Sequence, residues 1–521
     1  METPTKKLID DVDSYGTFPE YSVDVNSDGH VINRNGSVSP HLPYVNTEEV
    51  VSVKTHVYKR RWYVLLIFSL VAAVQGGYWN TWGPIAASTE EAFGWDDADI
   101  ALLSNWGPIA YIISAVFFAW VIDCQRYLNT PVMESRHNCL YLYTGIRISV
   151  LVAIFLVAAG AGIRCITSEP PYVKWTVHTG QLLNGLGGPV AMGLPPVLSA
   201  TWFPPHERTT ATAISQILNG LGVGVSFIIG PYLVPDKPPD NTNSSLHNNS
   251  YSTTTRPNTT DISARVTNER SEIMFLLYIE FGFAAFIFLL SLVYFPDKPL
   301  LPPCPTASIE RLEFKKGLSQ LLRNFKFWMV CLTYGVSLGV FNCWQSVLDV
   351  NLKPHGISEN EAGWLGFYGT LAASLTCVIV ARFSDVFTKH MRLFLVILYV
   401  GGALAMAWFT IIVNGYIPNS TTSLYVSIIL GTLLLNASPP LYYEMACEIT
   451  YPVAEGITNL WLTMMNNVGG LIFLLVQMVP NIGTSWENWC VIGAVVVCIP
   501  VLCTMDERYN RLEVDERSGK D

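Results

Sequence analysis

The sequence predicts an all-α polytopic membrane protein with twelve membrane-spanning helices in two pseudo-symmetric six-helix halves. Three observations predict this class. Half of the 521 residues are hydrophobic and only 14% are charged, whereas soluble proteins carry about 25% charged residues. The apolar residues gather in segments of roughly 20 residues, the length that crosses a bilayer as a helix. The first and second halves of the apolar region also repeat one another.

Twelve apolar segments account for most of the chain. In chain order we expect the spans near 62–86, 98–122, 145–167, 175–201, 209–234, 273–295, 327–351, 363–387, 391–413, 423–447, 455–480 and 487–504.

An internal repeat relates the two halves. Asn80-Thr-Trp82 corresponds to Asn342-Cys-Trp344, and each Asn is followed 43 residues later by an Asp, Asp123 or Asp385. Equal spacing across two hydrophobic hairpins indicates two copies of one membrane unit. Two-fold repeats of this kind are typical of secondary transporters.

The regions between and beside the spans set the domain organisation and orientation. Most of the 31 Lys and Arg fall on the side of the termini, which places both termini in the cytosol. A polar loop on the opposite side holds sequence motifs for N-glycosylation. The predicted glycosylation sites are Asn243, Asn248, Asn258 and, in a second loop, Asn419.

The expected regions are a disordered cytosolic tail (1–60), a first half (61–296, with the lumenal loop 235–271), a cytosolic linker (297–326), a second half (327–504) and a cytosolic tail (505–521).

Composition also excludes several classes of function. The formal net charge of −10 offers no basic face for nucleic acid. The eleven cysteines are scattered through the chain without a Cys-x-x-Cys motif, which is typical of packing residues rather than metal ligands. No phosphate-binding loop or hydrolase motif is present. We therefore expect no enzymatic activity, no catalytic residue, no metal site and no cofactor.

Two six-span halves joined by a basic linker resemble the major facilitator superfamily, whose halves rock about a central cavity. In that architecture, Asp residues after the second and eighth spans usually join a cytosolic charge network. The loops after spans four and ten also resemble each other in this sequence. The residues expected at such a gate are Asp123, Glu207, Arg208, Arg382, Asp385 and Glu455. Ordinary helix capping and topology charge are the alternative explanation.

Aromatic and amide side chains cluster on the spans that border such a cavity. Aromatic faces with a few amides suit a flat or cationic small molecule, and Gly76-Gly77 is expected to loosen the first helix beside them. An interfacial aromatic belt is the alternative. The predicted substrate-binding residues are Trp79, Asn80, Trp82, Gln181, Asn184, Tyr334, Asn342, Trp344 and Gln345.

Proton coupling requires a titratable group in or near the pathway, because ionisable groups inside membranes are costly and usually functional. Glu444 is the first choice, since it lies inside span ten near Pro439-Pro440. A carboxylate paired structurally with Arg is the alternative. The full set of candidates is Glu444, Glu448, Glu280, Asp349 and His178.

One segment carries a family resemblance. Residues Glu444 to Gly456 match the pattern Glu-x-x-x-Glu-x-Thr-Tyr-Pro-x-x-Glu-Gly in full, and Arg61 to Ser69 resemble the first span of the same family. On these residues the chain resembles solute carrier family 49, the feline leukemia virus subgroup C receptor family, over about residues 60–500. The segments from Tyr78 to Ile85 and from Gly180 to Pro189 resemble a lysosomal member. The resemblance implies a lysosomal membrane carrier with proton-driven export of pyridoxine (vitamin B6).

The choline-carrying members of that family hold the quaternary ammonium in a cage built from an aromatic residue on span one and a tyrosine on span seven. Trp79 falls on the first position and Asn342 on the second, while Gly188 falls where those members have a glutamine on span four. The cage is therefore incomplete. This departure favours a neutral hydroxylated or pyridine-type ligand over choline.

Both tails contain a tyrosine–x–x–bulky-apolar pattern that sends membrane proteins to endolysosomes. The two matches are Tyr509-Asn-Arg-Leu512 and Tyr15-Gly-Thr-Phe18. The expected partners are a small-molecule substrate, protons, membrane lipids and a clathrin adaptor, with the protein a monomer. A plasma-membrane carrier of choline, a related amine or a heme-type molecule, and a membrane nutrient sensor that does not transport, are the alternatives.

Overall fold

The protein is helical throughout the part that the computed structural model describes, which comprises residues 56–127, 145–235, 259–303, 314–386, 390–417, 420–479 and 482–507. No strand occurs within these ranges. The first half contains α1 (Arg61–Trp79), η3 (Gly83–Ile85), α2 (Ala86–Phe93), α3 (Asp97–Tyr127), α4 (Ile146–Arg164), α5 (Tyr172–Leu186), α6 (Gly188–Gly193), α7 (Pro195–Trp202), α8 (Pro205–Leu233) and α9 (Thr259–Val293). The expected linker contains α10 (Phe314–Arg323). The second half contains α11 (Phe325–Ser346), α12 (Leu348–Leu352), η7 (Lys353–His355), α13 (Glu359–Val386), α14 (Met391–Val413), α15 (Thr421–Leu435), α16 (Pro439–Thr450), α17 (Glu455–Gln477) and α18 (Ser485–Thr504).

The spans lie close to where the sequence placed them. Among the described residues, 11 helical segments are long and apolar enough to cross a membrane. The remaining expected span, 175–201, is divided into α5, α6 and α7 by breaks at Gly187 and Leu194. Pro189 and Pro195 sit in the first turn of the helix after each break, where a proline is tolerated because its missing N–H has no intrahelical partner. The twelve-helix prediction is confirmed with this interruption.

Two glycines in α1 behave differently from the expectation. The helix continues without a break through Gly76 and Gly77 to Trp79, so the prediction that they loosen it is wrong. They instead allow close packing against α8. A Cβ atom on Gly76 would lie 2.8 Å from Asn219 Nδ2, and one on Gly77 would lie 3.0 Å from Gly222 O. Small residues at such crossings let membrane helices approach closely.

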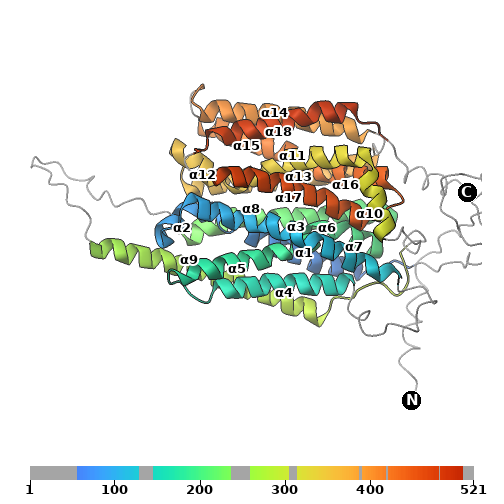
Figure 1. The fold of residues 1–521 in the computed structure, drawn as a ribbon, viewed down its shortest axis with the longest axis horizontal. Coiled ribbons are helices and arrows are strands. Elements are labelled where there is room, and N and C mark those ends of the chain that lie inside the picture. Colours follow the sequence, from blue (N-terminus) through green and yellow to red (C-terminus); the bar gives the residue numbers. More distant parts are fainter. Residues whose placement is uncertain are drawn as a thin grey trace, which may run out of the picture. The chain divides into compact units, whose positions relative to one another are not determined.

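Helix pairs in the first half recur in the second. The α1–α8 pair corresponds to α11–α17, and the α4–α5 and α4–α9 pairs correspond to α14–α15 and α14–α18. Each half has its own buried core, built from residues of 64–295 in one half and of 321–505 in the other, and Leu460 of α17 also joins the core of the first half. Contacts of α8 with α13 and of α3 with α17 join the halves side by side (Figure 1). The structure thus contains the duplicated architecture.

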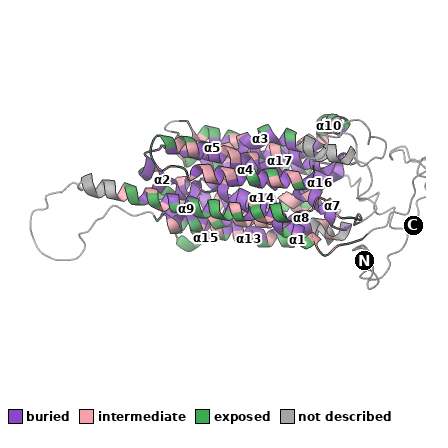
Figure 2. Ribbon diagram, turned by 90° about the horizontal axis from the view of Figure 1, so that it is seen from below, coloured by how far each residue is buried: buried purple, intermediate pink, exposed green. Residues whose placement is uncertain are grey.

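Large apolar side chains cover the outside of the helices. Figure 2 shows exposed residues along the outward face of α9, and these include Phe275, Phe286 and Leu289. An apolar outer surface of this extent is stable in lipid and unusual in water. The exposed faces therefore agree with a multi-pass membrane protein.

Several expected residues fall outside what the structure describes. The backbones of Asp123, Arg382 and Asp385 lie in α3 and α13, but their side chains are not described. The glycosylation and sorting residues also lie outside the described ranges, namely Asn243, Asn248, Asn258, Asn419, Tyr15, Phe18, Tyr509 and Leu512.

Candidate functional site

A cavity of about 210 Å³ lies between the two halves. Its wall is rich in amides and aromatic rings. Among the described residues that line it, none is Asp, Glu, Lys, Arg or His. The amide side chains are those of Gln75, Asn80, Gln216, Asn219, Asn342, Gln345, Asn436, Asn466 and Asn467. The rings are those of Trp79, Tyr111, Phe227, Tyr334 and Tyr443.

Trp79 stands at the end of α1, with its indole against α3. Its Nε1 donates a hydrogen bond to Ser104 O at 3.1 Å. The ring packs where α3 has no side chain, because a Cβ atom on Gly107 would lie 2.3 Å from Trp79 Cδ1. Trp79 therefore has one defined orientation at the cavity wall.

Two amides of α5 hold this end of α1 from behind. Gln181 Nε2 donates to Trp79 O at 3.2 Å, and Asn184 Nδ2 donates to Gln75 O at 3.2 Å. The carbonyl of Trp79 belongs to the last turn of its helix, where no intrahelical donor is available. Neither amide lines the cavity. The structure thus places Gln181 and Asn184 as supports of α1 rather than in the cavity wall.

The pseudo-symmetric asparagines both reach the cavity. Asn80 Nδ2 donates to Ser226 Oγ at 2.9 Å, while Asn80 Oδ1 is buried and has no hydrogen-bond partner within the described residues. Asn466 Oδ1 is in the same condition. A buried acceptor without a donor is unfavourable, so the packing of these two wall residues leaves polar groups unsatisfied beside the cavity.

The second half contributes a connected polar wall. Gln345 Nε2 donates to Thr370 Oγ1 at 3.1 Å, and Asn436 Nδ2 donates to Gln345 Oε1 at 3.3 Å. Nearby, the hydroxyl of Tyr334 donates to that of Tyr443 at 3.3 Å. These bonds orient the side chains before any ligand arrives, which lowers the entropic cost of binding.

Two of the expected aromatic residues point elsewhere. Trp82 is buried in a separate cluster, 6.2 Å from the ring of Trp95. Trp344 packs against Phe409 and donates from Nε1 to Asn488 Oδ1 at 2.8 Å. The structure brings Trp79, Asn80, Tyr334, Asn342 and Gln345 to one cavity and leaves both of these tryptophans outside its wall.

None of the five candidate proton-coupling residues lines the cavity. Asp349 and Glu448 are buried elsewhere, and Glu444 is half-buried. His178 accepts a hydrogen bond at Nδ1 from Trp106 Nε1 at 2.9 Å.

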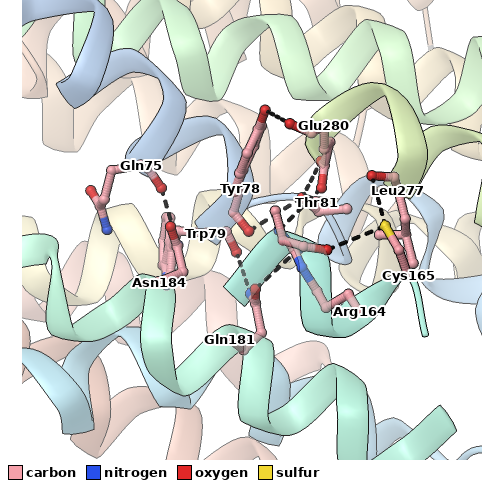
Figure 3. Close-up of polar contacts among 11 residues, drawn as sticks. Gln75, Tyr78, Trp79, Thr81, Arg164, Cys165, Gln181, Asn184, Leu277 and Glu280 are labelled. Carbon is pink, nitrogen blue, oxygen red and sulfur yellow. Dashed lines mark hydrogen bonds and ion pairs between the residues drawn. The ribbon is translucent and has the colours of Figure 1, made fainter. Parts of the chain in front are cut away.

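Glu280 is buried beside Arg164, a cation that was not among the expected functional residues. Its Oε2 lies 3.2 Å from Arg164 Nη2, and its Oε1 accepts a hydrogen bond from Thr81 Oγ1 at 2.6 Å (Figure 3).

At the end of the bundle where α1 begins, two of the expected gate residues, Glu207 and Arg208, make contacts within the first half. Glu207 forms a salt bridge with Arg61 at 2.9 Å. Arg208 donates to the carbonyl oxygens of Phe203 and Ala200, which end α7. Glu455 is buried in the first turn of α17.

The opposite end of the bundle carries a link between the halves that sequence reasoning missed. The carboxylate of Glu359, buried at the start of α13, accepts hydrogen bonds from Ser88 N at 3.0 Å and from Ser88 Oγ at 2.9 Å. Lys353 pairs with Glu90 at 2.9 Å beside it. α2 of the first half is therefore tied to α13 and η7 of the second.

Comparisons with known proteins agree with this architecture. The profile described as the Major Facilitator Superfamily matches residues 67–474. The Solute carrier family 49 member 4 homolog of Xenopus tropicalis is 35% identical over 463 residues, which cover 88% of this chain and 94% of that protein. The Choline/ethanolamine transporter FLVCR1 of Mus musculus is 27% identical over 432 residues, covering 81% of this chain and 70% of that protein.

Solved structures of similar fold are transporters. FucP in the outward conformation gives a TM-score of 0.58 at 12% identity, covering 85% of this chain and 98% of that one. The xylose transporter XylE from E. coli, in a partially occluded inward-open conformation, gives 0.59 at 13% identity, covering 87% and 99%. At this identity the likeness concerns the fold alone.

Proposed function

Because this chain belongs to the major facilitator superfamily and, within it, to solute carrier family 49, we propose that it is a proton-coupled carrier that exports a small neutral aromatic solute, of which pyridoxine is the leading candidate, from the lysosome. Membership of the family makes it a membrane transporter rather than an enzyme. The substrate, the compartment and the coupling ion are the parts that we propose here.

The observation that supports the substrate class is the composition of the cavity wall. Nine amide side chains and five aromatic rings line it, without an ionisable Asp, Glu, Lys, Arg or His among the described lining residues. An ion taken from water into such a wall would have no counter-charge, which is strongly unfavourable. A flat neutral molecule with several hydroxyl groups instead finds a ring to stack on and amides to bond with.

Pyridoxine has this chemistry. It carries a pyridine ring and hydroxyl groups and has no net charge near neutral pH. Its ring suits the indole of Trp79, and its hydroxyl groups suit the amide side chains of the cavity wall. A hydrogen bond to a neutral ligand contributes about 0.5–1.5 kcal/mol, so a few such bonds suffice to discriminate between vitamers.

The runner-up is a choline or ethanolamine carrier, as the FLVCR1 relative is named. The specific observation in its favour is that Trp79, Tyr334 and Tyr443 share one cavity, since aromatic faces attract quaternary ammonium groups. Two positions weigh against it. Asn342 and Gly188 also line the cavity, and there the choline-carrying members have a tyrosine and a glutamine.

Uptake across the plasma membrane tests the proposal. The full chain with Tyr15→Ala and Tyr509→Ala is expressed at the cell surface, where outside medium replaces the lysosomal lumen. We expect labelled pyridoxine uptake that rises when the outside pH is acidic. Trp79→Ala lowers this uptake, whereas the exposed Trp175→Ala, whose side chain lies outside the cavity, leaves it unchanged.

Three other results would each reject the proposal in a different way. Uptake of labelled choline in place of pyridoxine supports the runner-up. Pyridoxine uptake that does not depend on outside pH removes the proton coupling. Binding without uptake of either compound supports a nutrient sensor that does not transport.

A further inference from the structure

A buried ion pair crosses the first half behind the cavity. Arg164, at the end of α4, has no exposed side-chain surface, and it faces Glu280 of α9 at 3.2 Å. Ionisable side chains are costly to bury inside a membrane protein, even when they are paired. Both charges are present in the fold, on two different helices, and neither residue lines the cavity.

The pair connects to the cavity through a short chain of contacts, which Figure 3 draws. Arg164 Nη1 donates to Gln181 Oε1 at 3.4 Å, and Gln181 Nε2 donates in turn to Trp79 O at 3.2 Å. On the other side of the pair, Thr81 Oγ1 donates to Glu280 Oε1 at 2.6 Å. Both routes end on the segment 79–81, at the point where α1 unwinds beside the cavity.

From this geometry we propose that Glu280 is the proton-binding group of the carrier and that Arg164, through Gln181, transmits its protonation state to Trp79. The proposal rests on the proton-coupled function proposed above and assigns its proton to one residue. The step is a simple acid–base one. A proton from the lumen binds a carboxylate oxygen of Glu280, the carboxylate becomes a neutral carboxyl group, and no other bond is made or broken.

Protonation changes the forces on Arg164. Without its counter-charge the guanidinium is a buried, uncompensated ion, which is strongly unfavourable. Two other contacts remain to it: the face of the Tyr78 ring, whose centroid lies 5.5 Å from Arg164 Cζ, and the oxygen of Gln181. A stronger pull on Gln181 acts directly on the hydrogen bond to Trp79 O. The proton is thereby coupled to the orientation of the cavity wall without entering the cavity.

The other groups around Glu280 do not replace it as the proton site. Tyr78 donates its hydroxyl to the backbone oxygen of Glu280. Cys165 donates its thiol to the carbonyl oxygens of Ala161 and Leu277, each at 3.3 Å. With Arg164, these are the titratable neighbours on α1 and α4. Both are engaged as donors to backbone oxygens, and the carboxylate is the group among them that can accept a proton.

Reconstituted full-length protein in liposomes separates proton coupling from substrate binding. Exchange of labelled for unlabelled pyridoxine at equal pH reports binding and alternation of the two halves. Accumulation driven by a pH gradient reports coupling. We expect Glu280→Gln to exchange substrate while its gradient-driven accumulation falls to the level measured without a gradient. Glu269→Gln, which changes a second buried carboxylate of the same α9, keeps both activities.

Two further variants keep the proposal testable if Glu280→Gln does not fold. The double variant Arg164→Gln with Glu280→Gln removes both charges and leaves no buried ion unpaired. It is expected to exchange substrate without responding to a gradient. Thr81→Val removes a hydrogen bond that favours the charged carboxylate. It is expected to move the pH midpoint of transport upward by about one unit with no change in KM at saturating proton concentration.

The outcomes distinguish this inference from the function on which it rests. Wild-type protein that neither exchanges nor accumulates pyridoxine overturns the proposed function itself. Wild-type coupling together with full gradient-driven accumulation in Glu280→Gln, or in the double variant, overturns the assignment of Glu280 alone. An unshifted pH midpoint in Thr81→Val also contradicts the assignment.

Discussion

The contact between Trp79 and Gly107 gives the sharpest test of the cavity. In Gly107→Ala the new Cβ atom would lie 2.3 Å from Trp79 Cδ1 and 2.4 Å from Trp79 Nε1. Carbon atoms pack at about 3.5–4.0 Å, so the indole has to move by more than an ångström. The movement breaks the bond from Nε1 to Ser104 O and turns the ring away from the position in which a ligand stacks on it.

Two effects of different size follow. Overpacking costs about 1–3 kcal/mol of folding free energy, of which a gain in helix propensity of about 1 kcal/mol offsets a part. Loss of ring stacking costs about 0.5–1.5 kcal/mol of ligand binding. The second effect corresponds to a rise in KM of roughly 2- to 13-fold, because 1.4 kcal/mol is about a factor of 10.

The assay is substrate uptake as a function of concentration, at matched amounts of protein at the cell surface. Gly282→Ala is the matched control, since no atom lies within 4 Å of the Cβ position there. A double-mutant cycle then assigns the cause. If the methyl group of Gly107→Ala acts through the indole, it adds nothing in a Trp79→Ala background. An unchanged KM in Gly107→Ala, or an equal further loss in that background, would refute the reasoning.

Four other predictions concern substrate selectivity, the opening of the cavity between the two halves, membrane topology and subcellular location. Asn342→Tyr completes the aromatic cage and shifts the ratio of choline to pyridoxine uptake toward choline; an unchanged ratio contradicts the cage argument. Glu359→Ala removes charge-assisted hydrogen bonds, each worth about 1.5–3 kcal/mol, that tie α2 to α13. Cys343 in the cavity wall is then expected to react faster with an impermeant thiol reagent applied from the side of the membrane on which α2 lies. Lys326→Ala, which removes an exposed salt bridge with Asp506, serves as the control. Equal reaction rates in the two variants would show that the Glu359–Ser88 contact does not hold the halves together at this end. Glycosidase is expected to lower the apparent mass of the protein, and the shift is lost when the three sequons are changed together, at Asn243, Asn248 and Asn258. Tyr509→Ala moves the protein to the cell surface in microscopy, and a wild type already at the plasma membrane rejects the lysosomal address.

Positions related by the internal repeat have the same environment in the structure, although both tryptophans were expected in the cavity wall. Asn80 and Asn342 both line the cavity, and Trp82 and Trp344 are both buried outside it. In α11 the reason is geometric. Each residue advances by about 100° around a helix, so Trp344 lies roughly opposite to Asn342, while Gln345 lies on a neighbouring face. The presence of aromatic residues in a span does not show which face of the helix each of them occupies.

The partners of polar groups were harder to predict. Gln181 and Asn184 were expected to bind a ligand, but they bind backbone carbonyls of α1, and only the tertiary packing determines which acceptor an amide reaches. Ser88 and Glu359 lie far apart in sequence and carry no motif. Arg164 did leave a signal. It is the charged residue near the end of an otherwise apolar span, and a buried arginine requires a partner. Searching the other spans for a carboxylate gives Glu280 together with Asp349 and Glu444, and only the tertiary packing selects Glu280.

Because the ion pair lies apart from the cavity, the substrate specificity of such a carrier can change without a change in its proton-binding group. Where a carboxylate lines the binding site, the same group senses protons and contacts the ligand, so a change of ligand charge disturbs the coupling. Here the lining residues described are uncharged, and Arg164 and Glu280 act, on our proposal, through the backbone of Trp79. Residues at a distance without shared partners contribute nearly additively. A substitution in the second half of the wall, such as at Asn342, can therefore alter which ligand is bound while the proton site remains intact. This independence offers a physical route by which one architecture serves ligands as different as a neutral pyridine and a quaternary ammonium.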